Sequence, residues 1–253
     1  MKQNLKRAWI FALCLIPAAF IGGWLVTLYQ LDILPAAVIE KALEQLGGRT
    51  VLALISAVQS VGYALVCGFV GCLLAQNVGL WKPLRVEKKP LVLTLILSLV
   101  FGIVFSLDYW TFGKLEPMIA ESALAGTTPV AFAASVIYGG VMEEVMLRLF
   151  FMTGIAWVIG RVVYKKAPAE QWKSWVFIAA NVVAALLFAA GHLPATYTLF
   201  GGITPVLLVR CFLLNGGFGL LFGWLYRKYG IQYAMIAHAG LHIVSKVIWL
   251  LFI

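Results

Sequence analysis

Seven stretches of the sequence are each apolar over about 20 residues, the length that an α-helix needs to cross the hydrocarbon core of a bilayer. Lipid offers no hydrogen-bond partner to a bare backbone, so such stretches predict an all-α, polytopic transmembrane bundle of about seven to eight helices. The number stays open because the fourth stretch could be one protruding helix or a helix broken near Arg148. The stretches lie near residues 8–29, 51–77, 90–107, 129–160, 174–193, 204–226 and 231–253.

Composition supports one membrane domain over the whole chain, residues 1–253. Hydrophobic residues make up 63% of the sequence and charged residues only 11%, whereas soluble domains carry about 25% charged residues. Between the first two spans, residues 33–46 are amphipathic and are expected to lie at the membrane interface. Thr128-Pro129 and Thr204-Pro205 each place a capping hydroxyl before a proline suited to the first helical turn.

The positions of the basic residues predict the topology, because cytoplasmic loops of membrane proteins are enriched in Lys and Arg. Alternate loops are basic here, so we expect seven spans with a cytoplasmic N-terminus. The net charge of +9 is therefore explained mostly by the basic residues of the cytoplasmic loops. The lipid bilayer is then the natural partner of these loops, and nucleic-acid binding is not expected. Short loops suit a prokaryotic plasma membrane. The basic residues of these loops are Lys2, Lys6, Arg7, Lys82, Arg85, Lys88, Lys89, Arg161, Lys165, Lys166, Lys173, Arg227 and Lys228.

Three charged residues interrupt the apolar run of residues 129–160: Glu143, Glu144 and Arg148. An ionisable side chain at the centre of a membrane helix costs about 2.5–3.5 kcal/mol on insertion scales, so it usually faces a protein interior or a watery cavity. Glu144 and Arg148 are four residues apart and can neutralise each other. Glu143 is about 100° away around the helix and lacks that partner.

Every histidine of the chain lies within or at the end of a predicted span. His238 and His242 are four apart on the last span, and His192 lies on an earlier one. Three helices thus offer one carboxylate, Glu143, and three imidazoles that could converge. Glu143 could activate a water as general base, with the imidazoles orienting it or stabilising an oxyanion. Equally, the four side chains could bind zinc and leave an open position for water.

Other polar residues in the spans have simpler interpretations. Arg210 and Lys246 could extend their charged ends to an interface, and Asn181 and Asn215 suit hydrogen bonds between helices. The four cysteines have no paired CxxC spacing and are interpreted as small buried hydrophobic residues: Cys14, Cys67, Cys72 and Cys211.

The ordered motifs EExxxR from Glu143, FxxxH ending at His192 and HxxxH ending at His242 resemble those of the CPBP family (CAAX protease and bacteriocin-processing, also called Abi). The resemblance extends from Tyr138 to the C-terminus, within a family-like core over residues 129–253; the N-terminal helices over 8–107 match only as generic spans. It implies an intramembrane endopeptidase acting on a membrane-anchored protein or peptide, with or without a metal.

Carried over by position, the resemblance implies that Glu143 and His192 activate the attacking water, and that His238 and His242 stabilise the oxyanion. Glu144 and Arg148 complete the first motif as supporting residues. The third motif of the family usually ends in Asn or Asp, whereas this chain has His242, which can still donate a hydrogen bond but also favours metal binding. We expect the site to be reached from the cytoplasmic side.

The depths of the predicted site residues do not agree if both helices start at the same surface. His192 lies about 28 Å beyond Ser174, whereas His238 lies only about 10 Å beyond Ile231. A helical hairpin around residues 161–173 that stands out beyond the neighbouring loops would bring the two histidines level, and we predict that protrusion.

Two other classes of function remain open. Glu and His side chains in membrane helices also serve as proton relays, so a proton-coupled transporter is an alternative. The sequence shows no pair of broken helices in corresponding halves and no internal repeat, which argues against it. The second alternative is a catalytically inactive scaffold or immunity protein of the same family, for which His242 is the only hint.

Overall fold

The computed structural model describes residues 2–253, so Met1, the first residue of the predicted domain, lies outside the described residues. Within that range the ordered elements are helical, and seven of them are long and apolar enough to cross a membrane. Their bounds agree with the predicted spans, which confirms an integral membrane protein with an all-α bundle. The seven are Lys2–Ile33, Arg49–Asn77, Lys88–Ser106, Pro129–Tyr164, Ser174–Phe200, Pro205–Tyr229 and Ile231–Phe252.

Several of these spans are composed of shorter helical elements that follow one another without a loop. The elements are α1 (Lys2–Cys14), α2 (Ile16–Ile33), α3 (Ala36–Leu46), α4 (Arg49–Asn77), α5 (Lys88–Ser106), α6 (Phe112–Leu115), α7 (Pro117–Ala125), α8 (Pro129–Ala134), η1 (Ser135–Glu143), η2 (Val145–Met152), α9 (Thr153–Tyr164), η3 (Ala169–Gln171), α10 (Ser174–Phe200), α11 (Pro205–Cys211), η4 (Phe212–Gly216), α12 (Gly217–Tyr229) and α13 (Ile231–Phe252).

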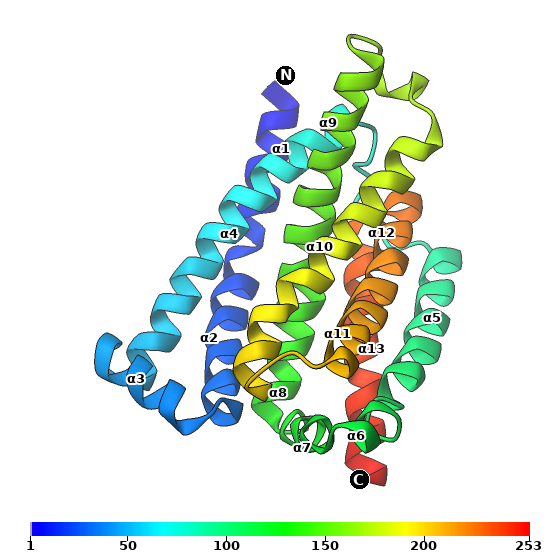
Figure 1. Cartoon of the computed structure of the whole chain (residues 1–253). Coiled ribbons are helices and arrows are strands. Elements are labelled where there is room, and N and C mark those ends of the chain that lie inside the picture. Colours follow the sequence, from blue (N-terminus) through cyan, green and yellow to red (C-terminus); the bar gives the residue numbers. More distant parts are fainter. Residues whose placement is uncertain (1) are drawn as a thin grey trace.

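The long helices run side by side, with the two chain termini at opposite ends of the bundle (Figure 1). One end, here called the N-terminal end, carries the start of α1 and the α4–α5, α9–α10 and α12–α13 connections. The other, the C-terminal end, carries α3, α6, α7 and the α10–α11 connection. Helix α13 packs against α5, η1 and α12, so the last span is central to the bundle.

The predicted helix starts are confirmed. The hydroxyl of Thr128 accepts a hydrogen bond from the Ala131 N–H at 3.2 Å, and Thr204 does the same for the Leu207 N–H at 3.2 Å. Each satisfies a backbone donor that the first helical turn leaves free. The amphipathic segment after the first span is also helical, as α3, and none of its residues is buried.

The fourth span is one continuous helical element and is not broken at Arg148. It is instead widened into π-helical turns over η1 and η2, on either side of Glu144. The Thr153 hydroxyl donates to the Arg148 carbonyl at 3.1 Å, five residues earlier. Single π-helical turns within α-helices occur frequently at functional sites, and these two contain or flank all three charged residues of the span.

The connection between α9 and α10 extends beyond the other connections at the N-terminal end, as predicted (Figure 1). Trp172 is buried there, and its ring occupies the space where a Cβ of Gly160 would lie. Its indole N–H donates to the Ala167 carbonyl at 3.3 Å. Trp172 thus attaches this hairpin to α9.

Candidate active site

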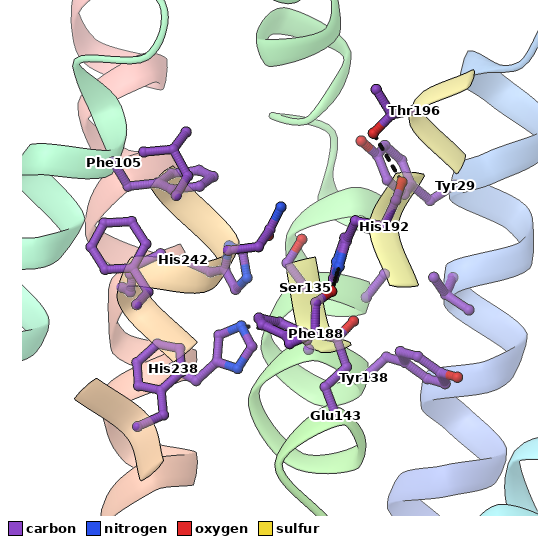
Figure 2. A pocket seen from close by; sticks show the side chains of 18 of the residues that line it. Tyr29, Phe105, Ser135, Tyr138, Glu143, Phe188, His192, Thr196, His238 and His242 are labelled. Carbon is purple, nitrogen blue, oxygen red and sulfur yellow. Dashed lines mark hydrogen bonds and ion pairs between the residues drawn. The ribbon is translucent and has the colours of Figure 1, made fainter. Parts of the chain in front are cut away.

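A cavity of about 320 Å³ lies inside the bundle and brings the four predicted catalytic side chains together. Glu143 reaches it from the last residue of η1, His192 from α10, and His238 and His242 from α13. Figure 2 shows their side chains around one space, with the two α13 imidazoles on one side and His192 on the other. The expected convergence of three helices is therefore present.

The cavity extends from the middle of the bundle to its C-terminal end. Glu143 and His238 lie toward its inner part, while Tyr29, Thr196 and Phe105 lie toward the other (Figure 2). Tyr29 and Phe105 are close to the C-terminal ends of α2 and α5. We expected both a cytoplasmic N-terminus and access from the cytoplasm. Because the cavity opens at the end away from the N-terminus, the two expectations are incompatible.

Glu144 sits at the centre of a buried charge network. Its Oε2 lies 3.4 Å from Nε of Arg148, and both side chains have no exposed surface, so the structure contains the ion pair that the spacing predicted. The other oxygen, Oε1, accepts a hydrogen bond from Nδ1 of His238 at 2.9 Å. This second contact was not foreseen, and it turns a local ion pair into a link between η2 and α13.

His238 is held in one orientation by this hydrogen bond and by aromatic packing. Its ring stacks on Phe222 at 4.5 Å between centroids and meets Phe188 edge-on. A carboxylate can only accept, so Nδ1 carries the hydrogen and Nε2 faces away from Glu144. Nε2 lies 3.9 Å from Oε2 of Glu143. The two adjacent glutamates therefore contact opposite nitrogens of one imidazole.

Glu143 is the carboxylate available for chemistry. It is 21% exposed, in contrast to the fully buried Glu144, and it lines the cavity. The prediction that Glu143 lacks the arginine partner of Glu144 is confirmed by the ion pair that Arg148 makes with Glu144. A partly exposed carboxylate beside an imidazole nitrogen suits a general base.

His192 has a defined tautomer. Its Nδ1 lies 2.8 Å from the carbonyl oxygen of Phe188, one turn earlier in α10. A carbonyl oxygen can only accept, so Nδ1 is the donor and Nε2 of the neutral ring carries the lone pair. The Thr196 hydroxyl in turn donates to the His192 carbonyl at 2.9 Å. His192 can therefore accept a proton from water or orient it.

His242 lies next to His238, with 5.1 Å between the ring centroids, and meets Phe105 edge-on. Gly139 leaves room for this pair. A Cβ at position 139 would stand 3.3 Å from Nε2 of His242 and 3.7 Å from Nε2 of His238. No local sequence pattern marks this glycine, because its role depends on contact with α13, about 100 residues later in the chain.

The structure does not support the zinc site considered for Glu143, His192, His238 and His242. Among the side chains of residues 2–253, no group of three His, Cys, Asp or Glu has an arrangement suited to a metal ion. The catalytic groups that the cavity presents are therefore the side chains of this chain.

Three of the simpler interpretations are corrected by the structure. Arg210 does not extend to an interface but forms a bidentate ion pair with Asp108, at 2.6 to 3.0 Å, beside the cavity. Lys246 is buried and donates to the Gly126 carbonyl, which caps the end of α7. Asn215 contacts the sulfur of Cys211 on its own helix and faces the cavity, so it does not join two helices.

Two other interpretations hold. Asn181 donates to the Leu220 carbonyl at 2.8 Å and so links α10 to α12, as expected of an interhelical hydrogen bond. The four cysteines are free thiols. Three of them are buried as predicted, whereas Cys14 is exposed on α1.

Comparison with known protein families gives one match. Residues 125–244 match the family described as type II CAAX prenyl endopeptidase Rce1-like. The matched segment runs from the end of α7 into α13 and includes all six predicted site residues. No curated protein and no solved structure matches the chain. The match confirms the resemblance drawn from the ordered motifs.

Proposed function

Because residues 125–244 belong to the CPBP family of CAAX-protease-like membrane proteins, we propose that the protein is an intramembrane endopeptidase. Its substrate is a membrane-anchored protein or peptide. The observation that carries this proposal is the shared cavity, in which Glu143, His192, His238 and His242 meet from three helices. Polar side chains inside a membrane bundle are costly and are retained where they have a function.

Glu143 and His192 activate the water. Glu143 is the carboxylate that remains outside the Arg148 ion pair, and Nε2 of His192 is unprotonated when Nδ1 donates to Phe188. A water held between them loses its proton to Glu143 as its oxygen attacks the peptide carbonyl. General-base catalysis of this kind contributes about 10²–10⁴-fold to the rate.

His238 and His242 act on the oxyanion and the leaving group. Nε2 of His238 lies 3.9 Å from Glu143, so a small movement or one water can pass the abstracted proton to it. The resulting N–H donates to the oxyanion, and the proton then moves to the departing amine as the C–N bond breaks. His242, beside His238, supplies a second donor where Asn or Asp is usual in the family.

Glu144 and Arg148 act as positioning residues. Glu144 fixes the tautomer and orientation of His238 through Nδ1, and Arg148 balances the charge of Glu144 in a site without exposed surface. Neither contacts the cavity. Their role is to ensure that Nε2 of His238, and not Nδ1, faces Glu143.

A comparison of the peptide termini present in membranes with and without active protein tests this proposal. Membranes from cells that express the native protein should contain new termini that are missing with Glu143→Gln at matched expression, and His192→Ala should give the same loss. Gln59→Ala is the control, because Gln59 is exposed on α4 and its side chain bonds, among residues 2–253, only to Tyr63. Identical termini for the native protein and Glu143→Gln would mean that the protein does not hydrolyse peptides.

A further inference from the structure

The two ends of the bundle differ in charge. The N-terminal end carries thirteen basic residues and two acidic ones, Glu87 and Glu170, over α1 and the α4–α5, α9–α10 and α12–α13 connections with the helix ends beside them. The basic residues are Lys2, Lys6, Arg7, Lys82, Arg85, Lys88, Lys89, Arg161, Lys165, Lys166, Lys173, Arg227 and Lys228. At the C-terminal end, the connections and α3, α6 and α7 carry Lys41, Arg49 and Lys114 against Asp32, Glu40, Glu44, Asp108, Glu116 and Glu121.

This asymmetry orients the bundle in the membrane. Short cytoplasmic loops near span ends are enriched in Lys and Arg, while acidic residues have little influence. The N-terminal end therefore faces the cytoplasm, and the C-terminal end faces the opposite, extracytoplasmic side. Because the connections of the spans alternate between the two ends without exception, the charge bias is consistent across all the loops.

The active-site cavity opens at the extracytoplasmic end. Gln30 in the last turn of α2 is exposed, and Thr196 and Arg210 near the α10–α11 connection are partly exposed; all three line the cavity. The parts of the chain that form the basic end contribute no lining residue among those that the structure describes. The buried His238 lies at the inner part of the same cavity.

An interfacial helix lies beside this opening. Helix α3 follows directly from α2, has no buried residue, and is separated from the end of α10 by a hollow lined by Pro35, Val38, Lys41 and Tyr197. A helix that is amphipathic yet covers no core suits the plane of the headgroups. The opening between α2 and α10 is thus level with the outer membrane surface.

We infer that the substrate enters from the extracytoplasmic side, as an extended peptide segment of a protein anchored at the outer face of the membrane. The inference rests on the proposed peptidase function and names the class of substrate for that site. It replaces cytoplasmic access, because a cytoplasmic peptide would have to pass between the packed helices at the basic end of the bundle, where no described residue of the connections lines the cavity, to reach Glu143.

Thiol labelling in intact bacterial cells tests the inference, using a charged, membrane-impermeant methanethiosulfonate. The background is Cys14→Ala, since the other three cysteines are buried. Thr196→Cys probes the cavity, Gln45→Cys on α3 probes the C-terminal end, and Ser174→Cys probes the basic end. We expect the first two to react in intact cells and Ser174→Cys only in inverted vesicles. Modification of Thr196→Cys from outside should also abolish the cleavage that depends on Glu143.

The opposite labelling pattern would overturn the inference, as would reaction of Gln45→Cys without reaction of Thr196→Cys. Complete modification of Thr196→Cys with undiminished cleavage would show that the substrate enters elsewhere. Labelling does not require catalysis, so its result is separable from the peptidase proposal. If the cysteines are labelled as expected but the peptide termini are the same for the native protein and Glu143→Gln, the peptidase function and the proposed substrate are refuted. The side on which the cavity opens would still stand.

Discussion

At the scale of single residues, Arg148 shows how the bundle holds a charge without water. Its guanidinium pairs with Glu144 and lies 5.1 Å from the centroid of the Phe188 ring. None of its three guanidinium nitrogens has a hydrogen-bond partner within residues 2–253. The opposite charge of Glu144 is therefore the main compensation for its burial, and the two residues depend on each other.

Arg148→Met should destabilise the protein by about 3–5 kcal/mol, because it leaves Glu144 as an uncompensated buried charge. Arg49→Met is the matched control. Arg49 pairs with Asp32, but the two side chains are half exposed, and such a pair contributes about 0–1 kcal/mol. Unfolding free energies measured in mixed micelles check the difference. Equal, small losses in the two variants would contradict the account.

The sequence predicted the pair of Glu144 and Arg148 but not its connection to His238. Spacing along one helix is visible in a sequence, since residues four apart share a face. The hydrogen bond from His238 depends on the rotation of α13 about its axis and on its position along η2. The residues near His238 in the sequence do not specify either of them. For the same reason Asn215 was interpreted as a link between helices, although it points into the cavity.

At the scale of elements, the approach of η1 to α13 determines the shape of the site. Gly140 allows this contact, because a Cβ at position 140 would stand 2.7 Å from the Cβ of Ala239. Gly139, one residue earlier, borders the two histidines of α13. The π-helical turns begin in this region, so the backbone is adapted to the catalytic residues where the helices are closest.

Gly139→Ala should reduce cleavage without lowering stability. The added methyl group would stand 3.3 Å from Nε2 of His242, which must shift by a few tenths of an ångström, and in ordinary contact with His238 at 3.7 Å, whereas alanine favours a helix over glycine by about 1 kcal/mol. Gly62→Ala in α4 is the control, since a Cβ there has no neighbour within 4 Å. Cleavage rates and melting temperatures of both variants check this. Full activity in Gly139→Ala would show that the histidine positions are not critical.

Helix starts could be read from the sequence, while the π-helical turns could not. Thr128 and Thr204 act within one turn of their own helices, so the TP motif was sufficient. The widening around Glu144 leaves the hydrophobic pattern intact and has no local signal comparable to a proline. From the sequence, the fourth span could be one protruding helix or a helix broken near Arg148, and neither alternative is a π-helical turn.

At the scale of the whole molecule, the order of spans and the position of the α9–α10 hairpin were predictable. Each span satisfies the length and hydropathy that lipid requires, and the mismatch in depth between His192 and His238 pointed to the protruding hairpin. Cytoplasmic access and a cytoplasmic N-terminus were expected together, but the cavity opens at the end away from the N-terminus, so the two do not fit one orientation. The end at which the cavity opens depends on how residues of α2, α5 and α10 come together around it, which no local sequence pattern specifies.

The central claim, that Glu143 drives peptide hydrolysis in this cavity, is tested most directly with purified protein. The native protein and Glu143→Gln, reconstituted in liposomes, would be compared for cleavage of the membrane-anchored peptide that the terminus analysis identifies. We expect the rate to fall by about 10²–10⁴-fold, the range for loss of a general base, with an unchanged melting temperature. A variant that cleaves at the native rate would contradict the assignment of Glu143 as the base.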